Sequence, residues 1–516
     1  MTWWRDAVIY QIYPRSFADS NGDGIGDLCG IVGRLDHLAW LGVDAIWLTP
    51  IMPSPNADWG YDVSDYVDVH PDLGSLDDFD LLVREAGERG IRILNDLVPN
   101  HTSNQHAWFR DPSRRDWYVW ADPKPDGSPP NNWMSHFGGS AWAFDEASGQ
   151  YYLHLFLPEQ PDLNWWNPAV ADAFDDILRF WFDRGVAGFR IDVCHAIVKD
   201  RELRDNPPAT EDDPPAVQVF GQRHVYSSNR PEVHDVLRRW RRVARSYRPE
   251  RVLLGETYVW DLETLASYYG RQDDELQLAF NIPFVHARLE KGAMSSIVEA
   301  VEERFPPHAW PCWTGSNHDA GRLASRWCGG DHRKIRCSLM LLLTLRGTPV
   351  LYYGDEIGLT NVDLTREQLL DPVGRRFYPA YPGRDPARTP MPWESGPGAG
   401  FTVPGAEPWL PIGDPGAANV AEQRDDPRSI LHLCRRLIEL RRAEADLRGA
   451  PYQRVQTPGP VWAYRRGRFC VVLNLGDAAE RAGVGGRIEV STSCEREGQE
   501  VSELELGPWE GAVLSS

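Results

Sequence analysis

The feature that most constrains the fold is an alternation of short apolar segments with longer amphipathic segments, from residue 8 to residue 353. Each apolar segment has the length of a strand buried on both faces, and each amphipathic segment suits a helix that covers such a strand. Repeated units of this kind close a parallel sheet, and eight of them favour an α/β fold of the (β/α)8 barrel type. The predicted strands are residues 8–13, 45–50, 91–98, 188–193, 252–255, 276–282, 312–315 and 349–353.

The amphipathic segments carry helix start signals. Ser75 precedes one of them, and Asp78 stands three residues further on, which is the arrangement of a capping box. Further helices are predicted at residues 167–183, 232–247, 334–345 and 429–443, and together they would form a ring around the barrel.

Two departures from the alternation predict additional domains. Residues 102–167 are dense in Trp, Pro, Gly and Asn and are too long for an ordinary loop, so we expect a small domain inserted after the third strand. Residues 446–516 show short alternating strands and Gly turns, typical of an antiparallel β-sandwich. The barrel takes residues 1–101 and 168–445, and its Pro- and Gly-rich runs at 206–215 and 371–427 are expected to overhang the barrel mouth.

Composition narrows the classes of partner. A formal charge of −21 argues against binding to nucleic acid, which needs clustered basic residues. The longest apolar stretch, residues 338–345, is too short to cross a membrane. No basic segment followed by an apolar run opens the chain, which predicts a cytoplasmic protein, and the eight Cys stand singly, as reduced core thiols do. We expect no organic cofactor, and a monomer or weak oligomer.

Acidic side chains follow several predicted strands at the end where barrel enzymes have their active sites. The third strand leads into Asp96 and His101, and the fourth, fifth and seventh lead into Asp192, Glu256 and Asp319. Such a cluster suits glycoside cleavage, in which one carboxylate attacks the anomeric carbon and a second protonates the leaving oxygen. In the retaining mechanism these two acids lie about 5–5.5 Å apart, a spacing that adjacent strand ends can provide.

The roles of two acids follow from their neighbours. Arg190 lies two residues before Asp192, hence on the same face of the strand, where its charge would keep Asp192 ionised as a nucleophile. Glu256 follows an apolar strand, and partial burial there would help it hold the proton that an acid must donate.

At residues 96–101, 188–193, 255–257 and 317–319 the sequence resembles the α-amylase superfamily, glycoside hydrolase family 13, and within it the oligosaccharide-acting α-glucosidase branch. The resemblance implies Asp192 as nucleophile, Glu256 as acid/base and Asp319 as a third acid that binds sugar hydroxyls. It also implies that the glucose at the cleaved bond is contacted by Tyr61, Asp62, His101, Arg190 and His318.

Residues 160–164, Gln-Pro-Asp-Leu-Asn, resemble the marker of the branch that acts on short sugars. In that branch an Asp and an Arg grip the outermost 4-hydroxyl, and Asp58 and Arg384 match those positions. A pocket closed in this way implies exo action, with one terminal glucose released. We expect Arg384→Ala to raise KM for maltose far more than it harms the fold.

A candidate calcium loop lies after the first strand. Residues 19–27 place oxygen-bearing side chains at alternate positions, as in the first part of an EF-hand loop, although Gly30 stands where the closing acid would be. Similar loops in the family bind one structural Ca²⁺, which implies as ligands Asp19, Asn21, Asp23, the carbonyl of Ile25, and Asp27.

Several alternatives stay open. A trehalose synthase, or another sucrose- or maltose-acting glucosyltransferase or isomerase, shares the same motifs and the same covalent intermediate. A barrel that serves as a chaperone or sugar-binding protein is disfavoured because all three acids are present. Val193 accompanies α-1,6 activity in the branch, but Cys194 and His195 depart from the usual residues, so the linkage is open. His195 is as consistent with core packing as with the leaving-group site, and Trp59 and the pair Trp165 and Trp166 are placed near the pocket.

Overall fold

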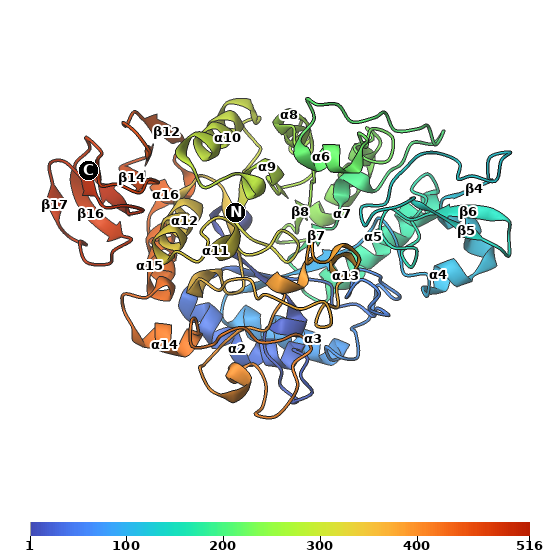
Figure 1. Cartoon of the computed structure of the whole chain (residues 1–516), viewed down its shortest axis with the longest axis horizontal. Coiled ribbons are helices and arrows are strands. Elements are labelled where there is room, and N and C mark those ends of the chain that lie inside the picture. Colours follow the sequence, from blue (N-terminus) through green and yellow to red (C-terminus); the bar gives the residue numbers. More distant parts are fainter. Residues whose placement is uncertain (1) are drawn as a thin grey trace.

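The computed structural model describes residues 2–516 and contains the predicted barrel (Figure 1). Eight parallel strands lie in the order β10, β11, β1, β2, β3, β7, β8, β9, and a parallel bridge between Phe280 and Cys312 links the last strand to the first and closes the barrel. The strands are β1 (Ile9–Ile12), β2 (Ala45–Leu48), β3 (Arg92–Leu97), β7 (Gly188–Ile191), β8 (Val252–Gly255), β9 (Leu278–Ala279), β10 (Cys312–Thr314) and β11 (Thr348–Tyr352).

All eight strands fall within the predicted segments or overlap them, but the sixth is much shorter than predicted. Asn281 caps the short helix α9 (Ile282–His286) by accepting a hydrogen bond from the backbone of Phe284. Pro283 follows at the start of that helix, where its missing N–H costs nothing. The prediction that the strand continues to residue 282 is therefore wrong, because local capping chemistry outweighs the apolar run.

Helices surround the barrel as predicted (Figure 1). The capping box at Ser75 and Asp78 is present, with both hydrogen bonds formed. Asn167 and Ser429 cap the helices that follow them. The longer helices are α2 (Leu28–Leu41), α3 (Leu76–Glu88), α5 (Pro168–Asp183), α7 (Val233–Arg245), α10 (Lys291–Arg304), α12 (His332–Thr344) and α15 (Ile430–Ala443). Shorter ones are α1 (Trp3–Asp6), α4 (Ala107–Arg110), α6 (Pro215–Phe220), α8 (Leu262–Ser267), α11 (Leu323–Arg326), α13 (Pro372–Phe377), α14 (Val420–Asp425) and α16 (Ala445–Gly449).

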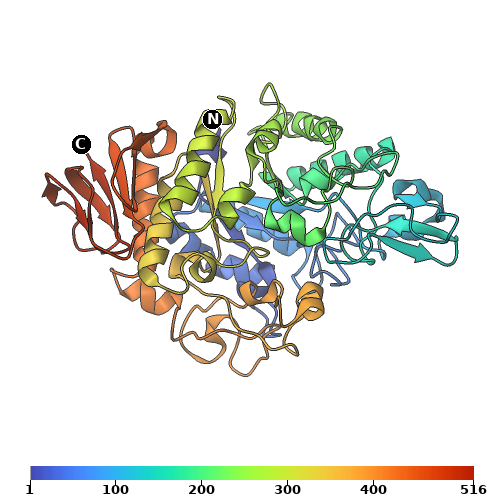
Figure 2. The ribbon, with the colours of Figure 1, turned by 45° about the horizontal axis from the view of Figure 1, so that its top comes forward.

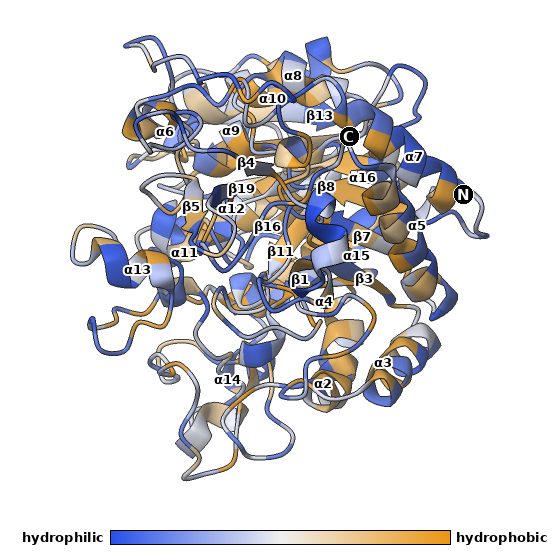
Figure 3. Cartoon of the chain, turned by 90° about the vertical axis from the view of Figure 1, so that its right-hand side faces the viewer, coloured by the Kyte–Doolittle hydropathy of each residue, from blue (hydrophilic) through white to orange (hydrophobic). Residues whose placement is uncertain are grey.

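The barrel is filled by side chains from alternate strand positions. One buried cluster joins Ile9, Trp47, Leu94, Leu254 and Val350, which come from five different strands. A larger cluster lies between the strands and the surrounding helices, and the strands at the centre are correspondingly hydrophobic in Figure 3. Because the barrel is a packed core, only the loops at the strand ends are free to form a cavity.

A small antiparallel sheet interrupts the barrel after β3 and projects to the right in Figure 1. It consists of β4 (Trp120–Ala121), β6 (Gln150–Leu153) and β5 (Trp142–Asp145), in that order. Two antiparallel bridges, from His101 to Asp162 and from Tyr118 to Leu163, join the ends of this segment next to β3. The insertion therefore lies beside the carboxyl end of a barrel strand.

The C-terminal segment forms an antiparallel β-sandwich at the opposite end of the molecule (Figure 2). A six-stranded sheet and a two-stranded sheet share one buried apolar cluster. Tyr464 bonds to Thr344 of α12 through its hydroxyl at 2.6 Å, which ties the sandwich to the barrel helices. The strands are β12 (Tyr452–Val455), β13 (Val461–Arg466), β14 (Phe469–Asn474), β15 (Glu480–Arg481), β16 (Gly486–Ser491), β17 (Glu500–Val501), β18 (Glu505–Leu506) and β19 (Gly511–Ser515).

The helix lengths and the state of the cysteines can be compared with the expectations from composition. Between residues 2 and 516, the helices are too short or too polar to cross a bilayer. The eight cysteines in this range are all unpaired, and six of them are buried. Their burial is consistent with packing as the role of these thiols.

Candidate active site

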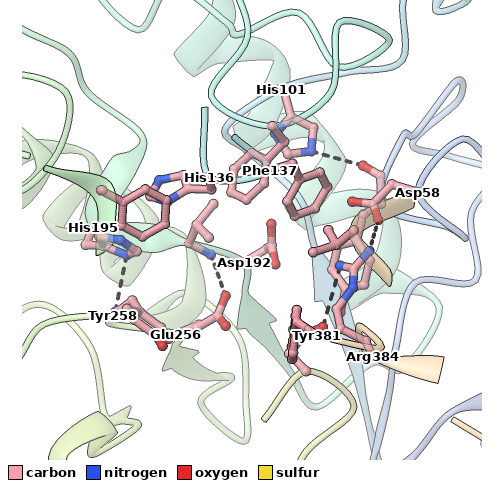
Figure 4. A pocket seen from close by; sticks show the side chains of 16 residues that line it. Asp58, His101, His136, Phe137, Asp192, His195, Glu256, Tyr258, Tyr381 and Arg384 are labelled. Carbon is pink, nitrogen blue, oxygen red and sulfur yellow. Dashed lines mark hydrogen bonds and ion pairs between the residues drawn. The ribbon is translucent and has the colours of Figure 1, made fainter. Parts of the chain in front are cut away.

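A cavity of about 330 Å³ lies at the carboxyl ends of the barrel strands (Figure 4). Its volume is at the lower end of the range of about 300–1,000 Å³ that is usual for ligand pockets, so it suits a small molecule. Seven of the ten predicted catalytic and sugar-binding residues line it: Asp58, Tyr61, His101, Asp192, Glu256, Asp319 and Arg384.

Arg190 lies beneath the cavity and joins the acids through one guanidinium group. Its Nη1 is 2.7 Å from Oδ1 of Asp192 and 2.9 Å from Oδ1 of Asp96, and its Nη2 is 2.7 Å from Oε2 of Glu256. The predicted pairing of Arg190 with Asp192 is present but incomplete, because Glu256 contacts the other end of the same side chain. Two carboxylates on one guanidinium can adopt the short spacing that retention needs.

The acids around Arg190 compete for a proton. Burial raises the pKa of Asp192 well above its ordinary value, and Glu256 adds to the shift; Arg190 opposes the shift but does not cancel it, contrary to the expectation that its charge keeps Asp192 ionised. Burial likewise raises the pKa of Asp96 to about 7 against the opposing effect of Arg190. Three carboxylates share one positive side chain, so the cluster favours holding a proton among its members. A site that cleaves a glycosidic bond needs such a mixture of ionised and protonated acids.

The backbone is strained at the residue directly after Asp192, which also contacts Glu256. Val193 directly follows Asp192 and has a φ of 34°, which a β-branched residue rarely adopts. Its N–H donates to Oε2 of Glu256 at 3.0 Å. The strained turn thus brings the backbone of one strand end against the carboxylate of the next, as strained residues at functional sites often do.

The third acid lies in a positively charged corner. Asp319 accepts a hydrogen bond from Arg388 at 2.8 Å and lies 3.7 Å from Arg384. Burial alone would raise the pKa of Asp319, but the surrounding positive charges outweigh it and bring the pKa below its usual range. His318 is 3.2 Å from Asp319, and its ring is stacked on Tyr61 with 2° between the planes. Asp319 is therefore an ionised acceptor, suited to hydroxyl groups.

One end of the cavity is closed by an ion pair between two loops. Arg384 Nη2 is 2.5 Å from Oδ1 of Asp58, and the same nitrogen is 2.7 Å from Oδ1 of Asp371. Burial raises the pKa of Asp58 to about 6, against the lowering effect of Arg384. Gln160, the first residue of the Gln-Pro-Asp-Leu-Asn segment, donates to Oδ2 of Asp58 at 3.1 Å. The inserted segment thus helps to fix the closed end.

Three predicted sugar-binding residues, Asp62, Arg190 and His318, lie behind the cavity wall and do not line the cavity. Asp62 accepts the backbone N–H groups of Ala57 and Asp58, each at 2.9 Å. It shapes the loop that carries Asp58. His318 holds the Tyr61 side chain in place, with a hydrogen bond of 2.6 Å between its Nε2 and the Tyr61 hydroxyl. For these residues the structure favours positioning over direct sugar contact.

The remaining walls were not predicted from the sequence. His136, Phe137 and Phe156 come from the inserted domain, Phe220 from α6, Tyr258 from the loop after β8, and Val373 and Tyr381 from the loop after β11. His195, whose role was open, also lines the cavity. Trp59, Trp165 and Trp166, which were placed near the pocket, are not among the residues that line it. The long loops that supply the walls were visible in the sequence, but not which side chains they would turn inward.

The candidate calcium loop packs against residues 401–409, away from the acids. Asp19 accepts the N–H groups of Gly22 and Gly24 at 2.7 and 2.8 Å, and Asp27 caps α2 by accepting the N–H of Gly30 at 2.7 Å. The oxygen-only ligand set suits Ca²⁺. However, in residues 2–516 no three acidic, His or Cys side chains converge closely enough to hold a metal. Since the predicted ligands also include the Asn21 side chain and the Ile25 carbonyl, this observation does not decide the site, and calcium stays a prediction.

The chain is similar to known proteins over most of its length. The family described as alpha amylase, catalytic domain, matches residues 11–449. The chain is 45% identical to a probable alpha-glucosidase of Rhizobium meliloti (strain 1021), over 92% of this chain and 90% of the relative. It is 38% identical to an oligo-1,6-glucosidase of Heyndrickxia coagulans, over 90% of each chain.

A solved structure extends the similarity to the whole fold. The crystal structure of the alpha-glucosyl transfer enzyme XgtA matches with a TM-score of 0.92 and 40% identity, covering 100% of both chains. Both hydrolases and a transfer enzyme are therefore similar to this chain. On the match to residues 11–449, the chain belongs to the alpha-amylase family, glycoside hydrolase family 13, and is a glycoside hydrolase.

Proposed function

We propose that the protein is an exo-acting, retaining α-glucosidase that releases terminal glucose from short α-linked glucosides. The observation that carries this proposal is the closed end of the cavity, where Arg384 bridges Asp58 and Asp371. A blocked end beyond a cavity of about 330 Å³ leaves room for one terminal sugar and none for a chain running through. The names of the similar α-glucosidase and oligo-1,6-glucosidase support the same substrate class.

In the proposed reaction, Asp192 attacks the anomeric carbon while Glu256 gives its proton to the leaving oxygen. The bond between the anomeric carbon and that oxygen breaks, and a β-glucosyl ester forms on Asp192. Water then attacks the anomeric carbon, the bond from that carbon to the Asp192 oxygen breaks, Glu256 takes up the water proton, and α-glucose leaves. Figure 4 supports these roles, since Glu256 lies on the side of Asp192 toward Tyr258 and His195, away from the closed end at Asp58.

Positioning residues complete the proposal. Arg190 holds both acids, and its charge would stabilise whichever carboxylate is ionised at each step. Asp319 would accept hydrogen bonds from sugar hydroxyls, and the Tyr61 ring would stack on the sugar. Burial lowers the pKa of His101 to about 3, so the ring is neutral and can donate or accept a hydrogen bond at the sugar.

Transfer to a second sugar is a second candidate activity, favoured by the similarity to an alpha-glucosyl transfer enzyme. Water and a sugar hydroxyl compete for the same glucosyl ester. We propose some transglucosylation beside hydrolysis, with dedicated transfer or isomerisation as the alternative. We also propose one structural Ca²⁺ at residues 19–27, remote from the reacting bond.

Proton NMR during digestion of maltose, isomaltose, sucrose and trehalose tests the proposal, because it reports the linkage, the anomer and the transfer products together. We expect α-glucose to form first. Asp192→Asn keeps the side-chain volume and should lose about 10³-fold or more in kcat. Appearance of β-glucose first would refute retention, and full activity of Asp192→Asn in a folded protein would remove Asp192 as nucleophile.

A further inference from the structure

A second cavity, of about 440 Å³, adjoins the first on the side away from the closed end. Four residues line both cavities: His136, His195, Phe220 and Tyr258. The labelled members of this set lie opposite Asp58 and Arg384 in Figure 4. A glucoside with its glucose at the closed end would therefore direct its leaving group into this second cavity, which we name the outer chamber.

The walls of the outer chamber are largely apolar. Val217 and Phe220 come from α6, Val225 from the segment that follows, and Val259 and Trp260 from the loop after β8. The Phe220 ring meets those of His136 and His224 edge-on at 5.7 and 5.3 Å, and these two His rings stack at 5.1 Å. One side of the chamber is thus a continuous aromatic surface, which suits a flat or apolar group.

The outer chamber is lined by two carboxylates and one Arg, and each of these groups already has a hydrogen-bonding partner. Its one cation, Arg223, has its Nε 2.8 Å from Asp213 and donates a second hydrogen bond to Thr210. Asp261 accepts the N–H and the hydroxyl of Thr264, both at 2.7 Å. Burial lowers the pKa of His136 and of His195, so these rings carry no charge at neutral pH. Because Arg223 is paired with Asp213 and Asp261 forms no ion pair among the described residues, the charge balance of the chamber disfavours a phosphate or a carboxylate.

We infer that the outer chamber selects uncharged leaving groups and acceptors with an apolar or aromatic body, and disfavours phosphorylated ones. The inference rests on the proposed function, since the chamber acts on the same glucosyl ester. In the transfer step, the acceptor hydroxyl oxygen bonds to the anomeric carbon, the bond from that carbon to Asp192 breaks, and the hydroxyl proton goes to Glu256. The chamber would hold the acceptor body while this exchange takes place.

The test is an acceptor competition with maltose as glucosyl donor. Benzyl alcohol, glucose and glucose 6-phosphate are supplied at equal concentration, and the glucosides and free glucose are quantified by chromatography. We expect benzyl glucoside to exceed the phosphorylated product by about tenfold or more, because a buried phosphate would lack a partner. Equal yields from benzyl alcohol and glucose 6-phosphate would overturn the inference, and so would maltose hydrolysis with no benzyl transfer.

Helix α6 offers a matched pair of variants. Val217 lines the chamber, whereas Val219 on the same helix is 84% exposed and does not. Val217→Asp should lower the ratio of benzyl transfer to hydrolysis by about fivefold or more, and Val219→Asp should leave it unchanged. Equal ratios in the two variants would refute the assignment of the chamber. If the wild-type protein neither hydrolyses maltose nor transfers from it, the proposed function itself fails, which is a distinguishable result.

Discussion

Replacing Arg384 by Ala perturbs the closed end of the cavity in two ways at once. Arg384 contacts both Asp58, at 2.5 Å, and Asp371, at 2.7 Å. Asp58 is 2% exposed and Asp371 fully buried. The substitution therefore removes a candidate sugar ligand and also leaves two buried carboxylates without their cation. Because of this burial, we expect a loss of stability beside the rise in KM for maltose.

These contacts set the expected losses of stability and of kcat/KM in Arg384→Ala. Breaking a buried ion pair costs about 3–5 kcal/mol. The lower value applies here, because burial already raises the pKa of Asp58 to about 6 and the carboxyl can escape its charge by protonation. For a chain of 516 residues, at about 1 °C per kcal/mol, the melting temperature should fall by about 3 °C. Loss of one charge-assisted hydrogen bond to glucose, about 1.5–3 kcal/mol, lowers kcat/KM for maltose by about 10- to 150-fold.

Thermal unfolding and maltose kinetics, measured well below the melting temperature of the variant, separate these two effects. Adding Asp371→Asn to Arg384→Ala removes one of the two unpaired charges, so it should restore part of the stability and none of the kcat/KM. An Arg384→Ala protein with an unchanged melting temperature would refute the burial argument. A kcat/KM within twofold of wild type would remove Arg384 from the sugar site.

Three further predictions address other parts of the molecule. Burial raises the folded-state pKa of Asp58 to about 6, so the folded protein binds this proton more tightly than the unfolded chain does. The resulting contribution to the free energy of unfolding is fully present below pH about 4 and is lost as the pH rises through about 6. In denaturant titrations at several pH values, Asp58→Asn should therefore remove up to about 3 kcal/mol of this pH-dependent loss of unfolding free energy. Parallel plots of unfolding free energy against pH for the variant and the wild type would contradict this. EDTA should lower the melting temperature if residues 19–27 bind Ca²⁺, and no shift together with no metal in the purified protein would end that proposal. Gly24→Ala should destabilise by about 1–3 kcal/mol, because φ is +88° and a Cβ would lie 1.9 Å from the carbonyl oxygen of Glu407; an unchanged melting temperature would count against it.

The barrel and its acids could be predicted because their signals are local. Strand length, helix periodicity and the rule that parallel strands end at one edge suffice to bring Asp192, Glu256 and Asp319 together. The same-face spacing of two residues correctly paired Arg190 with Asp192. It could not reveal Glu256 at the second guanidinium nitrogen, since that contact runs between two strands and depends on their stagger.

The walls of the cavity could not be predicted, for a different reason. His136 and Phe220 lie in an inserted domain and a long loop, where no periodicity decides which side chain turns inward. Asp371 likewise reaches Arg384 through the fold of the segment after β11, where the backbone N–H groups of Leu370 and Asp371 both donate to the Asp385 carboxylate. Such contacts are set by how loops pack on one another, and a single sequence carries no local signal for that.

The strand ends and the loops also decide different properties of the reaction: the strand ends decide that a glycosidic bond is cleaved, and the loops decide which acceptor takes the glucose. The acids on the strand ends specify that a glycosidic bond is cleaved, and a hydrolase and a glucosyl transfer enzyme are both similar to this chain. The partition between water and another acceptor is decided after the glucosyl ester forms, when the leaving group has vacated the space beside Glu256. In this chain that space is bounded by Phe220, Tyr258 and the neutral rings of His136 and His195, all from segments that follow the barrel strands. A change of acceptor should therefore come from substitutions at these four residues or at Val217 behind them, with the acids themselves unaltered.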